Sequence, residues 1–371
     1  MAHHRRRGHR RLFTLTGVLV CLPIIVVLAL ATGMRSAASD QNPLGIAGAG
    51  SPRATPSGSA RAYAASNGLG ILPKRTASPA PTAQPTATPV ITAAPGSKPW
   101  LAWKPTGAGK VTSIAMPAPW TGAGAATIDL SIYTPPGYDP AGTRLYPVVY
   151  EAPSSFDLWN SSTDSVAELD AMIDVGDMPA AIVVFASEAS PPISPSECQD
   201  SYDGQQSFET YFASTVVSYV DESYNTIQDP RARAIMGMSE GGYCAAMLAS
   251  RHPDIFTTSI SFSGYYTAGA AGIPSSGLFG PQANLDAHSP ALVVPQLTQA
   301  IRTSMYFIVV ADPTQDFYGS EATAFDKILA SNGVRYLAVN DSDGHGWDEV
   351  AQQIATAMEA WSAQLVLSGV W

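Results

Sequence analysis

A serine lies at the centre of a glycine-rich motif in the second half of the chain. Gly237, Met238, Ser239, Glu240 and Gly241 spell G-x-S-x-G. Where such a motif joins a strand to a helix, the sharp turn exposes the serine hydroxyl, which can then attack an acyl carbonyl if an acid and a histidine follow. The motif alone is a weak signal, because structural turns also use glycine and serine, so its meaning depends on those partners.

Histidines are scarce enough to be considered one by one. Beyond Lys98 they are His252, His288 and His345. His252 lies thirteen residues after Ser239, within the expected helix, and is interpreted as a surface or capping residue. His288 precedes the next expected strand, so no acid from the end of that strand could come before it. Only His345, in a loop after the last expected strand, satisfies the order serine, acid, histidine, and it is predicted to be the general base.

The acid should follow the apolar segment "YFIVVA", where "ADPTQDFYG" offers Asp312 and Asp316. Asp312 precedes a proline and could cap the turn, whereas Asp316 is far enough along the loop to approach the histidine. These residues alone leave both candidates open. Asp341 and Asp343 are too close to His345 in sequence for the usual arrangement and are expected to shape its turn.

The flanking sequence alternates between two kinds of apolar pattern. Short apolar or alternating runs predict strands, and apolar residues three or four apart predict helices. The strands are expected over 126–139, 146–152, 180–187, 231–236, 257–264, 304–311 and 334–341, and the helices over 161–177, 207–225, 241–252, 321–333 and 347–366. This alternation predicts a mostly parallel sheet with helices on both faces, and it puts Ser239 between a strand and a helix.

The N-terminal region has a different character. Residues 1–11 carry five arginines and no acid, and residues 12–33 are almost wholly apolar and uncharged. This run has the roughly 20 residues that a helix needs to cross a bilayer, and the arginines favour a cytoplasmic start with the remainder outside. The alternative is a cleaved signal peptide, for which Ser36 and Ala38 are suitable small residues. Because its apolar core would be about 7–15 residues, we predict an uncleaved, single-pass signal anchor at 12–33.

Composition divides the part of the chain that is predicted to be exported into a linker and a domain. Residues 34–97 are rich in Ala, Pro, Ser and Thr, which predicts a disordered linker, and residues 98–371 are predicted to form one catalytic domain. Of the 20 Lys and Arg, ten precede Lys98 together with a single acid, Asp40, so the remainder carries 10 basic and 29 acidic side chains. So acidic a domain is not expected to bind nucleic acid.

Three cysteines occur, one of them (Cys21) in the apolar segment. Cys198 and Cys244 form the outward pair, and a disulfide is expected because two thiols outside the cell often bond. Such a bridge would pin the loop after 180–187 beside Ser239; the alternative is two buried, unpaired cysteines. No CxxC, HxH or HExxH motif is present, so no metal site and no cofactor are expected.

Several stretches in this order resemble one family. "IYTPPGYDPAGTRLYPVVY", "DPRARAIMGMSEGGYCAAMLASRHPDIF", "SISFSG" and "DGHGW" are similar to the putative-esterase family of α/β-hydrolases, which includes esterase D, feruloyl esterase and mycolyltransferase relatives. The resemblance implies an α/β-hydrolase fold with Ser239 as nucleophile and His345 as base. The family's acid precedes a helix phenylalanine by about nine positions, and Asp316 before Phe325 fits that spacing.

The same resemblance implies an oxyanion hole formed by backbone N–H groups. One comes from Glu240, and by position Ser155 supplies the other. The family's usual His-Gly or Asp-Gly pair is absent, since the chain has Glu151, Ala152 and Pro153 before two serines. Each such donor lowers the barrier by about 2.7–4 kcal/mol, so the geometry of this loop decides how active the enzyme is.

The expected function is therefore that of an extracellular serine ester hydrolase without a cofactor. Its substrate would be a small-molecule or glycan ester, with a carbohydrate or cell-wall-linked ester as the favoured class. Two alternatives stay open: an acyltransferase that passes the acyl group to a sugar hydroxyl, and a non-catalytic, wall-associated binding domain. The long connections 188–206 and 265–290 are expected beside the catalytic edge of the sheet, where binding loops belong.

Overall fold

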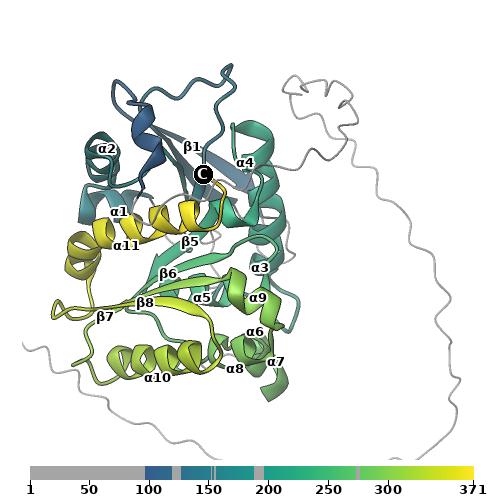
Figure 1. Cartoon of the computed structure of the whole chain (residues 1–371). Coiled ribbons are helices and arrows are strands. Elements are labelled where there is room, and N and C mark those ends of the chain that lie inside the picture. The colour runs from purple at the N-terminus through teal and green to yellow at the C-terminus, as the bar shows by residue number, and fades with distance from the viewer. Residues whose placement is uncertain (1–96, 119–126, 152, 154–155, 188–195, 273–275) are drawn as a thin grey trace, which may run out of the picture. The chain divides into compact units, whose positions relative to one another are not determined.

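One mixed sheet organises the chain (Figure 1). A computed structural model describes residues 97–118, 127–151, 153, 156–187, 196–272 and 276–371. Its strands are β1 (Lys110–Pro117), β2 (Thr127–Thr134), β3 (Val148–Glu151), β4 (Ile182–Ala186), β5 (Arg233–Met238), β6 (Thr258–Phe262), β7 (Tyr306–Ala311) and β8 (Arg335–Asn340).

The strands lie side by side in the order β1-β2-β4-β3-β5-β6-β7-β8. The pairs β1·β2 and β2·β4 are antiparallel, and every other pair is parallel. The parallel strands therefore end at one edge of the sheet, with β5 in the middle, which is the edge where open α/β sheets place their sites. The predicted mostly parallel sheet is confirmed.

The helical segments connect these strands. They are η1 (Pro99–Ala102), α1 (Phe156–Thr163), α2 (Ser165–Val175), α3 (Phe208–Thr210), η2 (Tyr211–Val216), α4 (Val217–Ser223), η3 (Pro230–Ala232), α5 (Glu240–Arg251), α6 (Ser276–Phe279), α7 (Gln282–Ala287), α8 (Pro290–Val293), η4 (Val294–Gln296), α9 (Gln299–Ser304), α10 (Tyr318–Ser331) and α11 (Trp347–Leu367).

Adjacent residues at the end of β3 show which helices cover which face. Successive side chains of a strand point to opposite faces of the sheet. The Tyr150 ring packs edge-on against Phe212 of η2 at a centroid distance of 6.1 Å, whereas Glu151 lies beside the indole of Trp159 in α1. Trp159 in turn contacts Trp347 of α11 at 5.1 Å. Helices α1 and α11 therefore cover one face and η2 the other, which confirms the expected layers.

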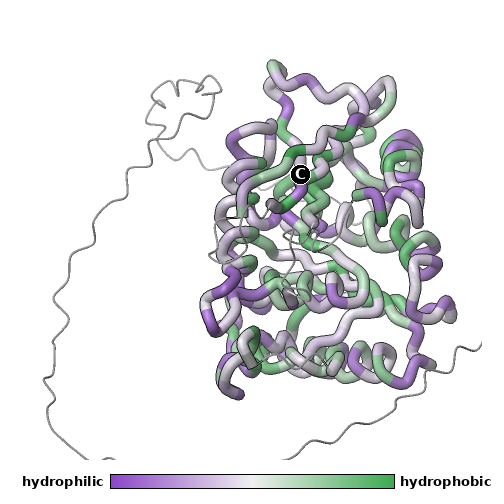
Figure 2. The backbone as a smooth tube through the Cα atoms, turned by 180° about the vertical axis from the view of Figure 1, so that it is seen from behind, coloured by the Kyte–Doolittle hydropathy of each residue, from purple (hydrophilic) through white to green (hydrophobic). Residues whose placement is uncertain are grey.

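The core fills the space between these layers. The parallel strands β3 and β4 are buried along their whole length, as are all but the end residues of β5 and β7. Figure 2 shows apolar residues gathered along the central strands, with hydrophilic residues on outer turns and helix surfaces. Such continuous burial is what a sheet covered on both faces requires.

The structure also corrects the sequence-based elements. The expected helix 161–177 belongs to two helices, α1 and α2, separated by Asp164, which adopts a left-handed φ of 51°. Strand β1 lies outside the predicted strands, because its residues are exposed or half-buried and its apolar residues do not alternate strictly with polar ones. The connection 265–290 contains the short helices α6 and α7, which are too short to give a clear helical period.

The predicted basic segment 1–11, signal anchor 12–33 and linker up to residue 96 lie outside the described residues. Among the helices that the structure does describe, none combines the length and apolar character that crossing a bilayer requires.

Candidate active site

Ser239 occupies the turn between β5 and α5 in a strained conformation. Its φ is 60° and its ψ is −115°, a region that costs a residue with a side chain about 1–3 kcal/mol. Its N–H donates to the carbonyl of Phe262 at 2.8 Å, which ties the turn to the end of β6. The turn thus projects Ser239 from the carboxyl edge of the central strand, at the N-terminus of a helix, whose partial positive charge favours developing negative charge.

Glycines make this turn possible. A Cβ atom on Gly237 would lie 2.4 Å from the backbone of Gly241, and one on Gly242 would lie 2.7 Å from Ser261 Oγ and 2.9 Å from the Cα of Gly264. These distances are far below van der Waals contact, so side chains at Gly237 and Gly242 would force strand and helix apart. The glycines are therefore a steric requirement of the turn.

His345 lies in the loop between β8 and α11, at the same edge of the sheet. It is flanked by Gly344, which has a φ of 78°, and by Gly346. Its imidazole stacks on the ring of Tyr318 with a centroid distance of 3.7 Å and an angle of 5° between the planes. Partial burial lowers the pKa of His345, which favours the neutral form that a general base needs.

The two candidate acids have different surroundings. Asp312 is 4% exposed, and its Oδ1 accepts hydrogen bonds from the Thr314 N–H at 2.8 Å and the Thr314 hydroxyl at 2.7 Å. Those bonds lower the pKa of Asp312, with smaller contributions from Gln315 and the Gly344 backbone. Asp316 is exposed, and its carboxylate accepts no hydrogen bond from the described residues. Asp312 therefore caps the turn after β7, whereas the Asp316 carboxylate has no hydrogen-bond donor among the described residues.

The three side chains predicted to form a catalytic triad are not hydrogen-bonded to one another among the described residues. Within the described parts of the chain, no hydrogen bond joins the Ser239 hydroxyl, the His345 ring and the Asp316 carboxylate. Catalytic hydrogen bonds are often long in a site without substrate and tighten only in the complex. The predicted residues Ser239, Asp316 and His345 thus lie at the carboxyl edge of the same sheet.

The predicted oxyanion donors are partly described. Glu240 begins α5, so its N–H lies in the first turn, where N–H groups point out of the helix end. Its Oε1 accepts the N–H of Glu197 at 2.9 Å. Ser155 lies outside the described residues. Glu151, which precedes that loop, is fully buried, and burial raises its pKa well above the usual value, an effect that the nearby Trp159 indole partly offsets.

A disulfide joins Cys198 to Cys244, with a Cα–Cα distance of 5.6 Å. It connects the loop after β4 to α5, five residues beyond Ser239. Glu197 and Cys198 both have left-handed backbone conformations, with φ of 47° and 53°. The hydroxyl of Tyr265 donates to Glu197 Oε1 at 2.6 Å. Glu197 and Cys198 are thus fixed to α5 and Tyr265 by a covalent bond and by hydrogen bonds.

One buried acid near the histidine loop was not singled out from the sequence. Glu349, in the first turn of α11, accepts a hydrogen bond from the Ser263 hydroxyl at 2.9 Å. Burial raises the pKa of Glu349 to about 8, and the neighbouring Asp341, Asp343 and Asp312 add to the rise. In sequence, an acid at this position resembles any residue that complements a helix N-terminus, so no pattern could have marked it as buried.

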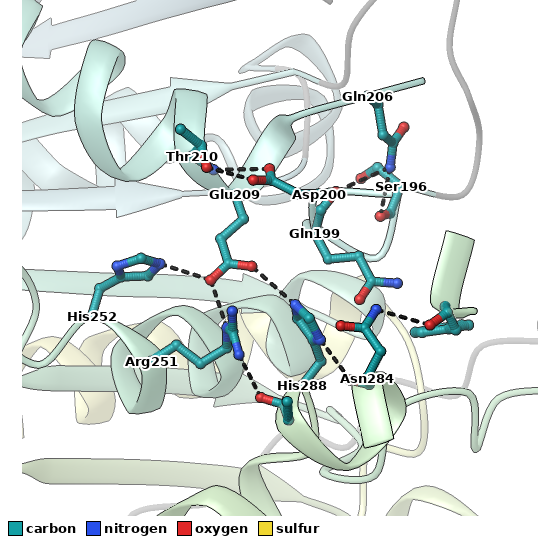
Figure 3. Close-up of polar contacts among 12 residues, drawn as sticks. Ser196, Gln199, Asp200, Gln206, Glu209, Thr210, Arg251, His252, Asn284 and His288 are labelled. Carbon is teal, nitrogen blue, oxygen red and sulfur yellow. Dashed lines mark hydrogen bonds and ion pairs between the residues drawn. The ribbon is translucent and has the colours of Figure 1, made fainter. Parts of the chain in front are cut away.

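The two other histidines belong to a separate cluster, as Figure 3 shows. Glu209 is buried, and its Oε1 lies 2.6 Å from Arg251 Nε and 2.8 Å from His252 Nε2. Its Oε2 lies 3.1 Å from Nε2 of His288, whose Nδ1 is 2.7 Å from the Asn284 carbonyl. Burial acts to raise the pKa of Glu209, but the bonds from His252, His288 and Arg251 together outweigh it and lower that pKa well below its usual range.

This cluster, Glu209–Arg251–His252–His288, lies at the opposite end of α5 from Ser239. Twelve helical residues separate the two ends, which corresponds to about 18 Å. The structure therefore does not bring His252 or His288 to the nucleophile. No group of three or more His, Cys, Asp and Glu side chains in the described ranges is arranged to hold a metal ion.

A family model described as "Putative esterase" matches residues 125–365. A search of curated proteins finds a protein of Corynebacterium glutamicum that is 28% identical over 139 residues. That match covers 37% of this chain and 32% of the relative, so the chain spans about a third of the relative's length.

Solved structures share the fold. A ferulic acid esterase is 18% identical with a TM-score of 0.55, and the match covers 69% of this chain and 98% of that one. FphF of Staphylococcus aureus, described as a fluorophosphonate-binding serine hydrolase, is 16% identical with a TM-score of 0.57 over 69% of this chain and 99% of its own. At such identities the likeness establishes an α/β-hydrolase-like fold.

Proposed function

The chain belongs to the family described as "Putative esterase" and is a serine esterase of that family; we propose that it cleaves a carboxylic ester through an acyl-enzyme formed on Ser239. The observation that carries this proposal is the conformation of Ser239. A residue with a side chain adopts a φ of 60° between the central strand and a helix, and such strain is retained where the function of a site requires it.

The proposed reaction has two steps. Ser239 Oγ attacks the ester carbonyl while His345 accepts the hydroxyl proton, and the N–H groups of Glu240 and Ser155 stabilise the oxyanion. When the intermediate collapses, His345 returns the proton to the departing alcohol and the acyl group stays on Ser239. Water, deprotonated by His345, then releases the carboxylic acid.

Asp316 is the proposed acid that orients the imidazole. Its carboxylate is exposed and accepts no hydrogen bond from the described residues, whereas the Asp312 carboxylate accepts hydrogen bonds from the N–H and hydroxyl of Thr314. Two residues beyond Asp316, the ring of Tyr318 touches His345. The proposal requires the Asp316 carboxylate to reach the imidazole when substrate binds, since catalytic hydrogen bonds often tighten only in the complex.

Hydrolysis of p-nitrophenyl acetate by the full chain tests the reaction class. The parent should release p-nitrophenolate, and Ser239→Ala should reduce kcat/KM to the background rate with an unchanged melting temperature. Ser331→Ala, on the exposed end of α10, is the matched control and should keep parental activity. Turnover by Ser239→Ala within tenfold of the parent would exclude Ser239 as the nucleophile.

A carbohydrate or cell-wall-linked ester is the proposed substrate class. Support comes from the acidic composition of the domain, from the predicted export, and from a fold neighbour described as a ferulic acid esterase. A screen over p-nitrophenyl esters of increasing chain length, acetylated sugars and feruloyl esters tests this. Addition of a sugar acceptor separates hydrolysis from transfer: free acid signals a hydrolase, and a new sugar ester signals an acyltransferase.

The proposed location is the outer face of the cell membrane, with residues 12–33 as anchor. The apolar run and its preceding arginines motivate this. Protease treatment of intact cells should digest the catalytic domain and leave a membrane-bound N-terminal fragment. Recovery of the whole protein from the culture medium would instead indicate cleavage.

A further inference from the structure

Four aromatic rings form a continuous path that ends on His345. The ring of Tyr243 stacks on that of Tyr265 at a centroid distance of 4.8 Å. Tyr265 contacts Phe317 at 6.2 Å, and Phe317 packs edge-on against Tyr318 at 4.9 Å. Tyr318 then stacks on His345 at 3.7 Å. We call the four rings Tyr243, Tyr265, Phe317 and Tyr318 the aromatic ladder.

The ladder begins on the helix that follows the nucleophile. Tyr243 lies in the first turns of α5, and its N–H donates to the carbonyl of Ser239 at 3.1 Å. Tyr243 and Tyr265 are buried. The hydroxyl of Tyr243 donates to the carbonyl of His288 at 3.0 Å, and that of Tyr265 donates to Glu197 Oε1 at 2.6 Å. Both rings are therefore fixed at two points, by packing and by a hydrogen bond.

At its Tyr318 end the aromatic ladder contacts His345, and this stacked contact is the main one that orients the histidine ring. The His345 ring makes no hydrogen bond with the described residues, and Gly344 and Gly346 flank it. Glycine allows the backbone many conformations, so the loop does not fix the ring. The parallel contact with Tyr318 is what sets the plane of the imidazole in this structure.

We propose that Tyr318 is a positioning residue for His345, and that the aromatic ladder transmits the position of the Ser239 helix to the imidazole ring. This inference rests on the proposed role of His345 as the base. The Tyr318 and His345 rings are stacked nearly parallel, and such a stack resists tilting because tilting loses van der Waals contact over the whole ring area. The ladder thus holds the base near the nucleophile before substrate binding, and the acid completes the alignment.

Stacking also shields one face of the imidazole from water. Such shielding disfavours the charged form, in the direction in which burial lowers the pKa of His345. Other ionisable groups near the loop are Asp312 after β7, Asp341 and Asp343 in the loop itself, and Glu349 of α11. These groups are the same in parent and Tyr318 variants, so a changed titration of His345 reports on the ring that was replaced.

Two substitutions at Tyr318 separate the ring from its hydroxyl. Tyr318→Phe keeps the stacked ring and should retain most of the parental kcat. Tyr318→Leu removes it and should lower kcat roughly 10- to 100-fold, since displacement of a catalytic group by about 1 Å can cost 10²-fold, while KM changes little. The acid limb of the pH dependence of kcat/KM should move to higher pH in Tyr318→Leu and stay in place in Tyr318→Phe. Tyr336→Leu, on β8, is the matched control.

Titration of the His345 imidazole by NMR gives a readout that does not require activity. In the full chain, His345→Gln assigns the signal of the imidazole C2 proton. Tyr318→Leu should raise the pKa of His345 and abolish the ring-current shift, and Tyr318→Phe should preserve both. If Tyr318→Leu does not fold, Phe317→Leu, which breaks the ladder one ring earlier, should lower kcat and raise the pKa in the same direction.

An unchanged kcat, acid limb and His345 signal in a folded Tyr318→Leu would overturn the proposal. A uniform loss of activity in that variant, with neither the acid limb nor the imidazole titration moved, would also overturn it, because that pattern indicates a merely structural role. Parent protein with no esterase activity but with the Tyr318-dependent signal would instead locate the failure in the proposed function.

Discussion

Cys244, five residues beyond Ser239, is bonded to Cys198 in the loop that follows β4. The bond therefore links the helix that begins at the nucleophile to a neighbouring segment of the same edge of the sheet. In the adjacent residue, the Glu197 N–H donates to the side chain of Glu240, whose own N–H is the proposed oxyanion donor. The bridge and the proposed oxyanion donor at Glu240 are thus linked through Glu197 and Cys198, which are adjacent in the chain.

Loss of this bridge should lower both stability and activity. It closes a span of 46 residues, for which the chain-entropy model gives roughly 4 kcal/mol, and measured bridges often give less. In the double variant Cys198→Ser/Cys244→Ser the melting temperature and kcat should therefore fall. Cys21→Ser is the control, because Cys21 is not part of the pair. In a second test, one sample of the parent is unfolded in denaturant with a reductant and then refolded, and another is left untreated. Identical melting curves of the two samples would count against the bridge.

Of the two aspartates after β7, we expect Asp316 to have a catalytic role and Asp312 a structural one. Asp316→Asn should lower kcat much more than Asp312→Asn, because it removes the negative charge that orients and stabilises the imidazolium. Asp312→Asn should lower the melting temperature more, because it weakens the bonds to Thr314. Kinetics and thermal unfolding of both variants check this. A crippled Asp312→Asn beside a near-normal Asp316→Asn would reverse the assignment.

The buried carboxylate of the Glu209–Arg251–His252–His288 cluster should be important for stability. Glu209→Gln removes the buried carboxylate that pairs with the partly exposed Arg251 guanidinium and contacts His252 and His288, and loss of a hydrogen bond to a charged group typically costs about 1.5–3 kcal/mol. Because the pKa of Glu209 is lowered in the folded state, its contribution is complete above about 4.3, the ordinary value, and is lost as the pH falls through the lowered value. Thermal unfolding should show a large difference between parent and Glu209→Gln at neutral pH that shrinks only in strong acid.

Glu222→Gln is the matched control for that comparison, since Glu222 is exposed on α4. It should shift the melting temperature little at any pH. Equal shifts in Glu209→Gln and Glu222→Gln would mean that the cluster contributes no more than a surface charge.

The pH dependence of turnover should reflect the environment of His345. Burial lowers its pKa in the free protein, and the neutral ring is the active form. The kcat/KM value should therefore stay high as the pH falls past about 6.5, the ordinary histidine value, and decline only at lower pH. Measurement of kcat/KM over this range checks the direction. An acid limb above 6.5 would show that an acidic neighbour, rather than burial, dominates the pKa.

The sequence predicted the framework of the sheet because its signals are local. The buried runs of β3 to β7 and the glycine pair Gly237 and Gly241 depend only on neighbouring residues. The histidine could be selected because chain order excluded His252 and His288, which the structure places at the Glu209 cluster. Strand β1 lacks such a signal, because its residues are exposed or half-buried at the edge of the sheet and its apolar residues do not alternate strictly with polar ones.

What the sequence could not predict depends on contacts between distant segments. The stack of Tyr318 on His345 joins residues from α10 and the loop after β8, and neither residue carries a motif that points to the other. The same holds for Glu349, whose burial follows from the packing of α11 beside Ser263. Periodicity identifies which face of an element is buried, but not which of several polar residues meet there.

Labelling with a fluorophosphonate probe tests the central claim most directly, because the probe bonds covalently to an activated serine. The full-length parent is incubated with the probe, digested and analysed by mass spectrometry, with Ser239→Ala and Ser331→Ala treated in parallel. The account predicts that the parent and Ser331→Ala carry the modification on Ser239 and that Ser239→Ala carries none. A folded parent labelled at another serine would contradict the assignment of Ser239, and a folded parent that stays unlabelled would contradict the account and favour a binding domain that retains the fold without the chemistry.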